Sequence, residues 1–186
     1  MKQGKGFTLV ELMLTLAIVA IIFKIVVPSF QQLFLQHQVQ AESQKWFSAF
    51  HLARQTAISQ GHIVTLCPSK NGKQCGKSWQ QGAIIFVDEN RNHLRDDTEQ
   101  VTQHIAPAIA KFHLSWRAFQ NRNYVQFQQN GFTWHQNGTL RLCVNSGVSE
   151  FNRALIVTRT GRVRLSRDND GDGYHEDAKG EQITCK

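Results

Sequence analysis

Residues 1–28 of this 186-residue chain, MKQGKGFTLVELMLTLAIVAIIFKIVVP, carry the pattern that is most informative about the fold. It combines a short basic leader, a Gly6-Phe7 junction and a nearly unbroken apolar run over residues 7–27. At about 1.5 Å per residue, roughly 20 helical residues cross a bilayer, so this run is long enough to span one. Two charges interrupt it, Glu11 near one end and Lys24 near the other.

Three interpretations compete for this segment. A secretory signal would use Lys2 and Lys5 as its basic start and residues 18–20 as a small-residue cleavage site. A carboxylate inside an apolar segment costs about 2.5 to 3.5 kcal/mol on insertion, so Glu11 has no purpose in a segment that is only discarded. A plain membrane anchor explains the length and the flanking lysines, but it leaves Glu11 equally unexplained.

The third interpretation accounts for the acid. The run Gly6-Phe7-Thr8-Leu9-Val10-Glu11 resembles the motif of the type IV prepilin and pseudopilin family. The resemblance implies that a prepilin peptidase cleaves between Gly6 and Phe7, that the new amine of Phe7 is methylated, and that Glu11 neutralises the amine of a neighbouring subunit. It also implies a single-pass protein of the bacterial inner membrane with a periplasmic head, which later joins other pilin subunits in a pilus at the cell surface. For Glu11 the alternative is an acid that snorkels to the interface.

The helical pattern continues over residues 28–60 and stops at Gly61, while Pro28 predicts a bend. Apolar residues recur along it at helical spacing, which predicts a stripe buried against a second layer. This stripe consists of Phe30, Leu33, Phe34, Trp46, Phe47, Phe50, Ala53, Ala57 and Ile58. The predicted organisation is a leader peptide (1–6), a transmembrane helix (7–27), a periplasmic half-helix (28–60) and a head (61–186).

From residue 62 the apolar period changes to two, which is typical of strands. Phe112, Leu114 and Trp116, for example, alternate with polar residues. Turn dipeptides such as Asn71-Gly72 and Asn137-Gly138 separate the runs. The predicted strands cover residues 62–67, 83–88, 101–105, 111–119, 124–128, 139–145, 154–159 and 162–166. The fold class is therefore α+β and pilin-like: a long N-terminal helix, membrane-spanning in its first half, packed on a C-terminal antiparallel β-sheet head.

Four cysteines indicate an oxidising compartment for the head. Cys67 and Cys75 bracket a short loop rich in turn formers, and joining Cys143 to Cys185 would attach the C-terminal tail to a strand. We expect this pairing among the three that four cysteines allow, with free thiols as the alternative. The spacing does not match a zinc site, because no C-x2-C motif is present.

Further residues of the head extend the family resemblance. They are Cys67-Pro68-Ser69, Cys75, Trp79, Gly82, Ile84-Ile85-Phe86-Val87-Asp88-Glu89-Asn90 and Gly161-Arg162-Val163-Arg164. Together they are similar to the GspH/FimT branch of minor pilins and pseudopilins, most of all to FimT. Members of this branch sit at filament tips or help to start assembly, and some FimT proteins bind DNA through a C-terminal Gly-Arg-x-Arg. The resemblance implies a DNA-binding site at Gly161, Arg162 and Arg164.

Charge points to the same region. The formal net charge is +7, and it becomes +5 when Lys2 and Lys5 leave with the leader. Between residues 101 and 167 nine bases face a single acid, Glu150, and nine minus one leaves +8. The bases are Lys111, Arg117, Arg122, Arg141, Arg153, Arg159, Arg162, Arg164 and Arg167. Such a surface attracts phosphate through counterion release, largely without regard to sequence.

Alternation on the last predicted strand places the two motif arginines on one face. If Val163 and Leu165 face the core, Arg162 and Arg164 project outward about 6.5 Å apart, close to the spacing of backbone phosphates. A planar guanidinium can hold phosphate oxygens bidentately. The alternative is a solvated strand face whose arginines only discourage edge pairing. The arginines that we expect to bind DNA are Arg159, Arg162, Arg164 and Arg167.

Two acidic loops carry part of a calcium-binding pattern. The run Asp168-Asn169-Asp170-Gly171-Asp172-Gly173 begins like such a loop, but Lys179 stands where the chelating Glu would be. The other loop is closer in spacing, although His93 replaces the expected glycine. Its candidate ligands are Asp88, Asn90, Asn92, Asp96 and Glu99. We expect solvated turns at both, with calcium as the lesser alternative and no other cofactor.

Enzyme motifs are absent, since the chain has no G-x-S-x-G elbow, H-E-x-x-H pair or phosphate-cradling loop. We therefore expect no enzymatic activity. The leading hypothesis is a minor type IV pilin that binds DNA non-specifically and helps capture it for natural transformation. The alternative is a structural minor pilin or type II secretion pseudopilin that initiates or caps the filament. Trp134 and Tyr124 could stack on bases, although core packing is the commoner role of such residues.

Overall fold

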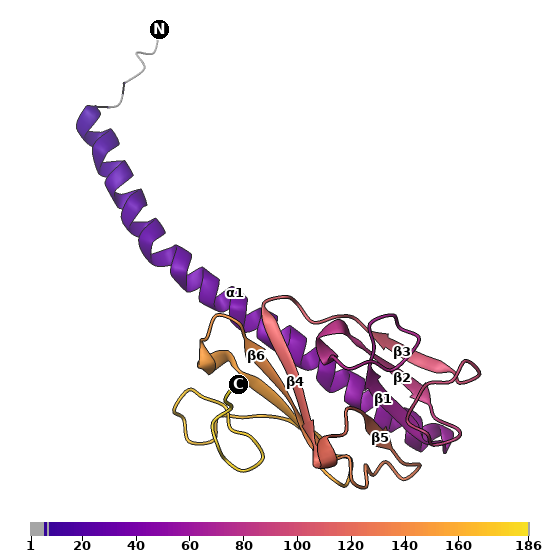
Figure 1. The fold of residues 1–186 in the computed structure, drawn as a ribbon. Coiled ribbons are helices and arrows are strands. Elements are labelled where there is room, and N and C mark those ends of the chain that lie inside the picture. Colours follow the sequence, from indigo (N-terminus) through magenta and orange to yellow (C-terminus); the bar gives the residue numbers. More distant parts are fainter. Residues whose placement is uncertain (1–5, 7, 186) are drawn as a thin grey trace. The chain divides into compact units, whose positions relative to one another are not determined.

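The computed structural model describes residue 6 and residues 8–185, and it divides the chain into two compact units, Met1–Gln38 and Val39–Lys186. Helix α1 (Leu9–Gln60) begins in the first unit and ends in the second (Figure 1). Its apolar side chains there are exposed, and by length and composition it is the one helix among the described residues that could cross a membrane. A helix that is apolar all round requires an apolar environment, which a bilayer supplies.

In the second unit α1 buries one face in the core of the head. Val39, Trp46, Phe50 and Ala53 are at most 1% exposed. They recur every three or four residues apart from one longer gap, as expected for a helix that packs on a sheet. Helix α1 ends at Gln60, and Gly61 follows with a φ of 65°, the left-handed conformation that commonly terminates helices.

The predicted helical stripe is correct only in its second part. Phe30 is 67% exposed and Leu33 is 49% exposed; both belong to the first unit, in which the described residues form no second layer besides α1. Ile58 is also 43% exposed at the far end. The helix continues through Pro28 without interruption.

All eight predicted strands occur, with ends within two residues of their predicted positions. The first antiparallel sheet has the order β3-β2-β1-β5. Its strands are β1 (Val64–Pro68), β2 (Ala83–Val87), β3 (Val101–Ile105) and β5 (Val125–Phe127). The second has the order β4-β6-β7-β8. Its strands are β4 (Phe112–Ala118), β6 (Gly138–Val144), β7 (Arg153–Val157) and β8 (Val163–Leu165).

An aromatic group joins α1 to the second sheet. The ring of Trp116 on β4 lies 5.7 Å from that of Phe50 and 5.6 Å from that of Trp79, measured between centroids. Trp79 stacks on Phe50 at 6.0 Å and meets Trp46 edge-on at 5.8 Å. Such pairs contribute stability beyond the area that they bury. The face of the second sheet that bears Trp116 is therefore its inner face.

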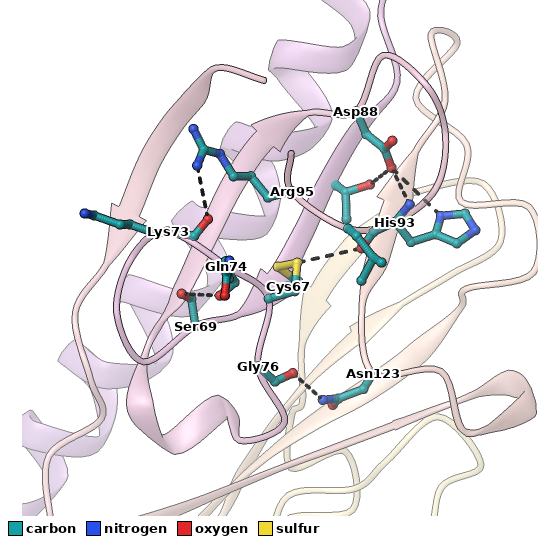
Figure 2. The surroundings of a disulfide bond; sticks show 12 residues. Cys67, Ser69, Lys73, Gln74, Gly76, Asp88, His93, Arg95 and Asn123 are labelled. Carbon is teal, nitrogen blue, oxygen red and sulfur yellow. Dashed lines mark hydrogen bonds and ion pairs between the residues drawn. A yellow bond between two sulfur atoms is a disulfide. The ribbon is translucent and has the colours of Figure 1, made fainter. Parts of the chain in front are cut away.

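The C-terminal segment is attached to the outer face of the second sheet. The disulfide between Cys143 on β6 and Cys185 holds its end, with 6.0 Å between the two Cα atoms. Ile183 beside it is 1% exposed, and its carbonyl accepts a hydrogen bond from the Asn152 side-chain amide. The second disulfide joins Cys67 to Cys75 with a Cα–Cα distance of 5.5 Å (Figure 2). The predicted pairing is therefore confirmed.

Candidate nucleic-acid interface at the edge of the second sheet

Strand β8 lies at one edge of the second sheet and carries the Arg-x-Arg sequence. It pairs with β7, with Val163 opposite Val157 and Arg164 opposite Ile156. Val163 is 6% exposed and faces inward, so alternation directs Arg164 to the outer face of the sheet. Arg162 immediately precedes the strand and is exposed, whereas Arg164 is half-buried. The outward placement predicted from alternation thus holds, with Arg162 the more accessible of the two.

The turn between β7 and β8 positions these arginines. The Gly161 amide donates to the Thr158 carbonyl at 2.9 Å, and the Thr158 amide donates to the Arg162 carbonyl at 3.0 Å. The Thr158 hydroxyl also accepts a hydrogen bond from the Arg162 amide at 3.1 Å. Gly161 is buried with a φ of 74°, and a Cβ there would collide with the Gly131 carbonyl oxygen. Gly161 therefore shapes the turn that presents Arg162.

A surface groove of about 590 Å³ runs along β8. Its lining consists of Phe47 on α1, residues 162–167 and Asn169. An apolar ring beside guanidinium groups is a suitable surface for a polyanion that also has apolar parts, such as a nucleic acid. The groove is open along an unpaired strand edge, so an extended chain could lie in it.

The arginines around β8 are free to bind a ligand. Within residues 8–185 the side chains of Arg159, Arg162, Arg164 and Arg167 form no hydrogen bond or ion pair with the protein. Three of these four are exposed, and the fourth, Arg164, is half-buried. A guanidinium that is not held by the protein can reach phosphate oxygens without losing an internal partner.

Other bases of the predicted cationic stretch have structural roles. Arg141 donates to the Thr184 carbonyl at 3.2 Å and pairs with Asp177 at 3.6 Å. Arg153 donates to two backbone carbonyls, and burial lowers its pKa. Arg122 donates to Gln120 at 2.9 Å. Three of the nine bases are thus held by the protein, whereas the four around β8 are not.

An acidic loop directly follows Arg167. The side chains of Asp168, Asp170, Asp172 and Glu176 bring ligand atoms within 4.8 Å of one another. Desolvation raises the pKa of Asp168, but hydrogen bonds from the Gly171 and Gly173 amides outweigh it and hold that pKa below its ordinary value. Carboxylate oxygens are the ligands that Ca²⁺ prefers, and Glu176 is a residue that sequence reasoning did not include. The position of Glu176, eight residues after Asp168, is the feature of the sequence that could have indicated it as a candidate ligand.

The loop predicted as closer to a calcium site is arranged differently (Figure 2). Asp88 is 1% exposed and accepts hydrogen bonds from the Thr65 hydroxyl and the Gln126 amide, at 2.8 and 2.9 Å. Glu99 is 3% exposed and accepts backbone amide hydrogen bonds at 2.9 and 3.0 Å. Asp96 accepts two more from the side chains of Asn90 and Asn92. Protein donors therefore occupy oxygens of these candidate ligands, and solvated turns at both loops, with calcium as the lesser alternative, stay the prediction.

The N-terminal candidates lie at the start of α1. Gly6 is exposed, and Phe7 lies outside the described residues. The Thr8 hydroxyl accepts a hydrogen bond from the Glu11 amide at 3.3 Å, which caps the helix. Glu11 thus lies in the first turn of α1, where the helix dipole favours a negative charge. Cleavage, methylation and the assembly role of Glu11 stay predictions.

The two aromatic candidates for base stacking have different surroundings. Tyr124 is half-buried and stacks on His93, with 4.4 Å between ring centroids. Trp134 is 55% exposed. Two further exposed aromatics, Phe119 and Phe132, were not among the predicted candidates, because sequence alone does not show which apolar residues of a loop face solvent.

Comparison with known proteins agrees with this architecture. Residues 1–23 match the prokaryotic N-terminal methylation motif, and residues 42–161 match the family described as Type II transport protein GspH. A long apolar N-terminal helix, this motif and an antiparallel β head define a type IV minor pilin or pseudopilin. Because the family match covers more than half of the chain, the chain belongs to the GspH family, and it is of the GspH/FimT kind. No curated protein matches the chain.

Solved structures share the fold. The type IV minor pilin FimU of Pseudomonas aeruginosa superposes with a TM-score of 0.56 at 19% identity, covering 70% of this chain and 90% of FimU. The minor pseudopilin EpsH from the Type 2 Secretion System of Vibrio cholerae superposes with a TM-score of 0.50 at 9% identity, covering 69% of this chain and 95% of EpsH. These likenesses confirm the predicted pilin-like α+β fold.

Proposed function

We propose that this minor pilin binds DNA without regard to sequence, through the arginines around β8, and helps capture it for uptake in natural transformation. The observation that carries the proposal is local. Four arginines without protein partners surround one exposed sheet edge and its groove. These arginines are Arg159, Arg162, Arg164 and Arg167.

The physical basis of this binding is neutralisation of phosphates. Each phosphate that a cation neutralises releases condensed counterions, so affinity falls steeply as the salt concentration rises. Non-specific binding of this kind has dissociation constants of about 10⁻⁴ to 10⁻⁶ M at physiological salt. Such an affinity suits reversible capture, which does not depend on the sequence of the incoming DNA.

The test compares two double variants that lose the same charge. In the full-length protein in a neutral detergent, R162Q/R164Q removes two cations from the β8 edge, whereas K70Q/R91Q removes two exposed, unpartnered cations from loops outside the basic stretch of residues 101–167. With each exposed charge pair worth up to about 1 kcal/mol, we expect R162Q/R164Q to weaken duplex binding by up to about 30-fold. The matched control should change affinity by less than about threefold, since it alters only long-range attraction.

Two results would count against the proposal. Equal losses in both double variants would show that net charge, and not the β8 edge, attracts DNA. No retardation of duplex DNA at low salt would favour the second candidate, a structural subunit that initiates or caps a pilus or a secretion pseudopilus. The family match and the likeness to FimU and EpsH support that second candidate equally well.

Delivery of the head to a filament depends on the N-terminal segment. We infer that a prepilin peptidase cleaves the chain between Gly6 and Phe7 at the inner membrane, and that Phe7 is then methylated. Glu11 would become the contact with the neighbouring subunit. Mass spectrometry of the mature protein should find a methylated N-terminal Phe7, whereas a chain that starts after Ala20 would contradict pilin processing.

A further inference from the structure

The exposed aromatic residues of the head lie in two neighbouring loops. Among the aromatic residues described in Val39–Lys186, only Phe119, Phe132 and Trp134 are exposed, by 54%, 45% and 55%. The Phe119 amide donates to the Asn137 carbonyl at 3.2 Å, which connects the two loops. His135 is also exposed, and its ring lies 6.2 Å from Phe119 and 6.1 Å from Trp134. We call Phe119, Phe132, Trp134 and His135 the aromatic ledge.

The backbone holds Trp134 outward. Thr133 is fully buried, whereas both of its neighbours are exposed. Trp134 has a φ of 50°, a left-handed conformation that is uncommon for a bulky residue. Gln120 and Asn121, in the other loop, also have positive φ values, 59° and 53°. Strained positions of this kind persist only where the surroundings fix them, and they cluster at binding sites.

The aromatic ledge adjoins the proposed DNA site. The Thr133 amide donates to the Arg159 carbonyl at 3.0 Å, and its hydroxyl donates to the Thr158 carbonyl at 3.0 Å. Gly131 in the same loop packs against Gly161 in the β7–β8 turn. The turn that bears Arg159 and leads into Arg162 is thus bonded to the loop that bears Trp134.

Aromatic rings beside unpartnered guanidinium groups match one ligand chemistry. Unpaired bases stack on aromatic side chains, while arginines bind the phosphates that link those bases. A duplex keeps its bases stacked inside, so it can offer only phosphates to the same surface. Exposed apolar patches also form protein interfaces, but a protein partner would have to supply acids opposite the arginines.

We propose that the aromatic ledge stacks unpaired bases, so that the protein binds single-stranded DNA more tightly than duplex DNA. This inference rests on the proposed function, because Arg159 and Arg162 must hold the backbone of the same strand. Trp134 is the central residue of the site. Trp46 and Trp79 are at most 3% exposed and Trp116 is half-buried, so a base on the ledge would quench the fluorescence of Trp134 selectively.

The test uses the full-length protein in neutral detergent, an oligothymidine of about 20 nucleotides and a duplex of the same length. The oligothymidine should quench the tryptophan fluorescence. Trp134→Ala should remove the quenching and weaken the oligothymidine complex by about 5- to 100-fold, while changing duplex affinity by less than about twofold. Trp134→Phe keeps a ring and should retain most of the affinity. Leu94→Ala, which alters another exposed apolar residue, should change neither complex.

The outcomes separate this inference from the proposed function. If the parent binds both DNA forms and Trp134→Ala binds oligothymidine as the parent does, the ledge is not a base-stacking site. The same conclusion follows if Trp134→Ala weakens both complexes equally, or if it changes only self-association. If the parent binds neither form at low salt, the proposed function itself fails. The variant R162Q/R164Q should weaken both complexes, because both use phosphate contacts.

Discussion

Replacing Gly161 by Ala tests the turn that presents Arg162. Gly161 has a φ of 74°, and an L-residue in this left-handed region costs about 1–2 kcal/mol. The added Cβ would also collide with the Gly131 carbonyl oxygen, a backbone atom that cannot move aside as a flexible side chain would. Overpacking of this kind costs about 1–3 kcal/mol. Together the two effects should lower the free energy of unfolding by about 2–5 kcal/mol.

Gly147 provides the matched control. Its φ is 76°, nearly that of Gly161, but no atom lies within 4 Å of a Cβ built there. Gly147→Ala therefore carries only the conformational cost of about 1–2 kcal/mol. The difference between the two variants isolates the collision with Gly131.

Thermal unfolding followed by near-UV circular dichroism reports the packed tryptophans of the head. At about 2–4 °C per kcal/mol for a chain of this size, Gly161→Ala should lower Tm by about 4–20 °C and Gly147→Ala by about 2–8 °C. Duplex affinity should fall in Gly161→Ala alone, because displacement of the turn moves Arg162. Equal decreases in Tm for the two variants would mean that the packing of Gly161 against Gly131 contributes nothing to stability, contrary to this prediction.

Three further predictions concern other parts of the head. The Cys143 and Cys185 cross-link closes a loop with a sequence separation of 42, so replacing both by Ser should cost about 4 kcal/mol in denaturant unfolding; a loss below about 1 kcal/mol would contradict this. Asp88→Ala should cost about 3–5 kcal/mol because it leaves buried donors unpaired, whereas Asp97→Asn, at a 99% exposed side chain, should stay within about 0.5 kcal/mol. Burial and the nearby Arg153 hold the pKa of His175 below 6.5, so the unfolded chain binds more protons than the folded one and stability should fall as the pH drops below about 6.5. In thermal melts between about pH 7.5 and 5.5, His175→Gln should reduce this dependence of stability on pH. An unchanged dependence in the variant would argue against this role of His175.

Much of the fold could be predicted from local patterns. The period of two in residues 111–117 marks β4, because alternate side chains of a strand face opposite sides. Gly61 marks the end of α1 for a similarly local reason, its access to positive φ. The division of the strands between two sheets could not be predicted, because it depends on pairings between distant segments, such as β1 with β5.

The sequence predicts which residues form the candidate site, but it does not predict what surrounds them. The sequence motif identifies Arg162 and Arg164, and alternation assigns their face. The sequence does not show that Arg141 and Arg153 bind other parts of the protein, because their partners are backbone carbonyls and an acid that only the fold brings near them. Nor does it show that Phe30 is exposed, because helical spacing identifies a stripe but not the length of the layer that covers it.

The salt dependence of duplex binding by the full-length protein tests whether the β8 edge binds DNA. The logarithm of the binding constant should fall linearly with the logarithm of the salt concentration, with a slope of about −0.9 for each phosphate neutralised. If Arg162 and Arg164 each neutralise one phosphate, R162Q/R164Q should reduce the magnitude of the slope by about 1.8, whereas K70Q/R91Q should leave it unchanged. An unchanged slope in R162Q/R164Q, or an equal change in both variants, would contradict DNA binding at the β8 edge.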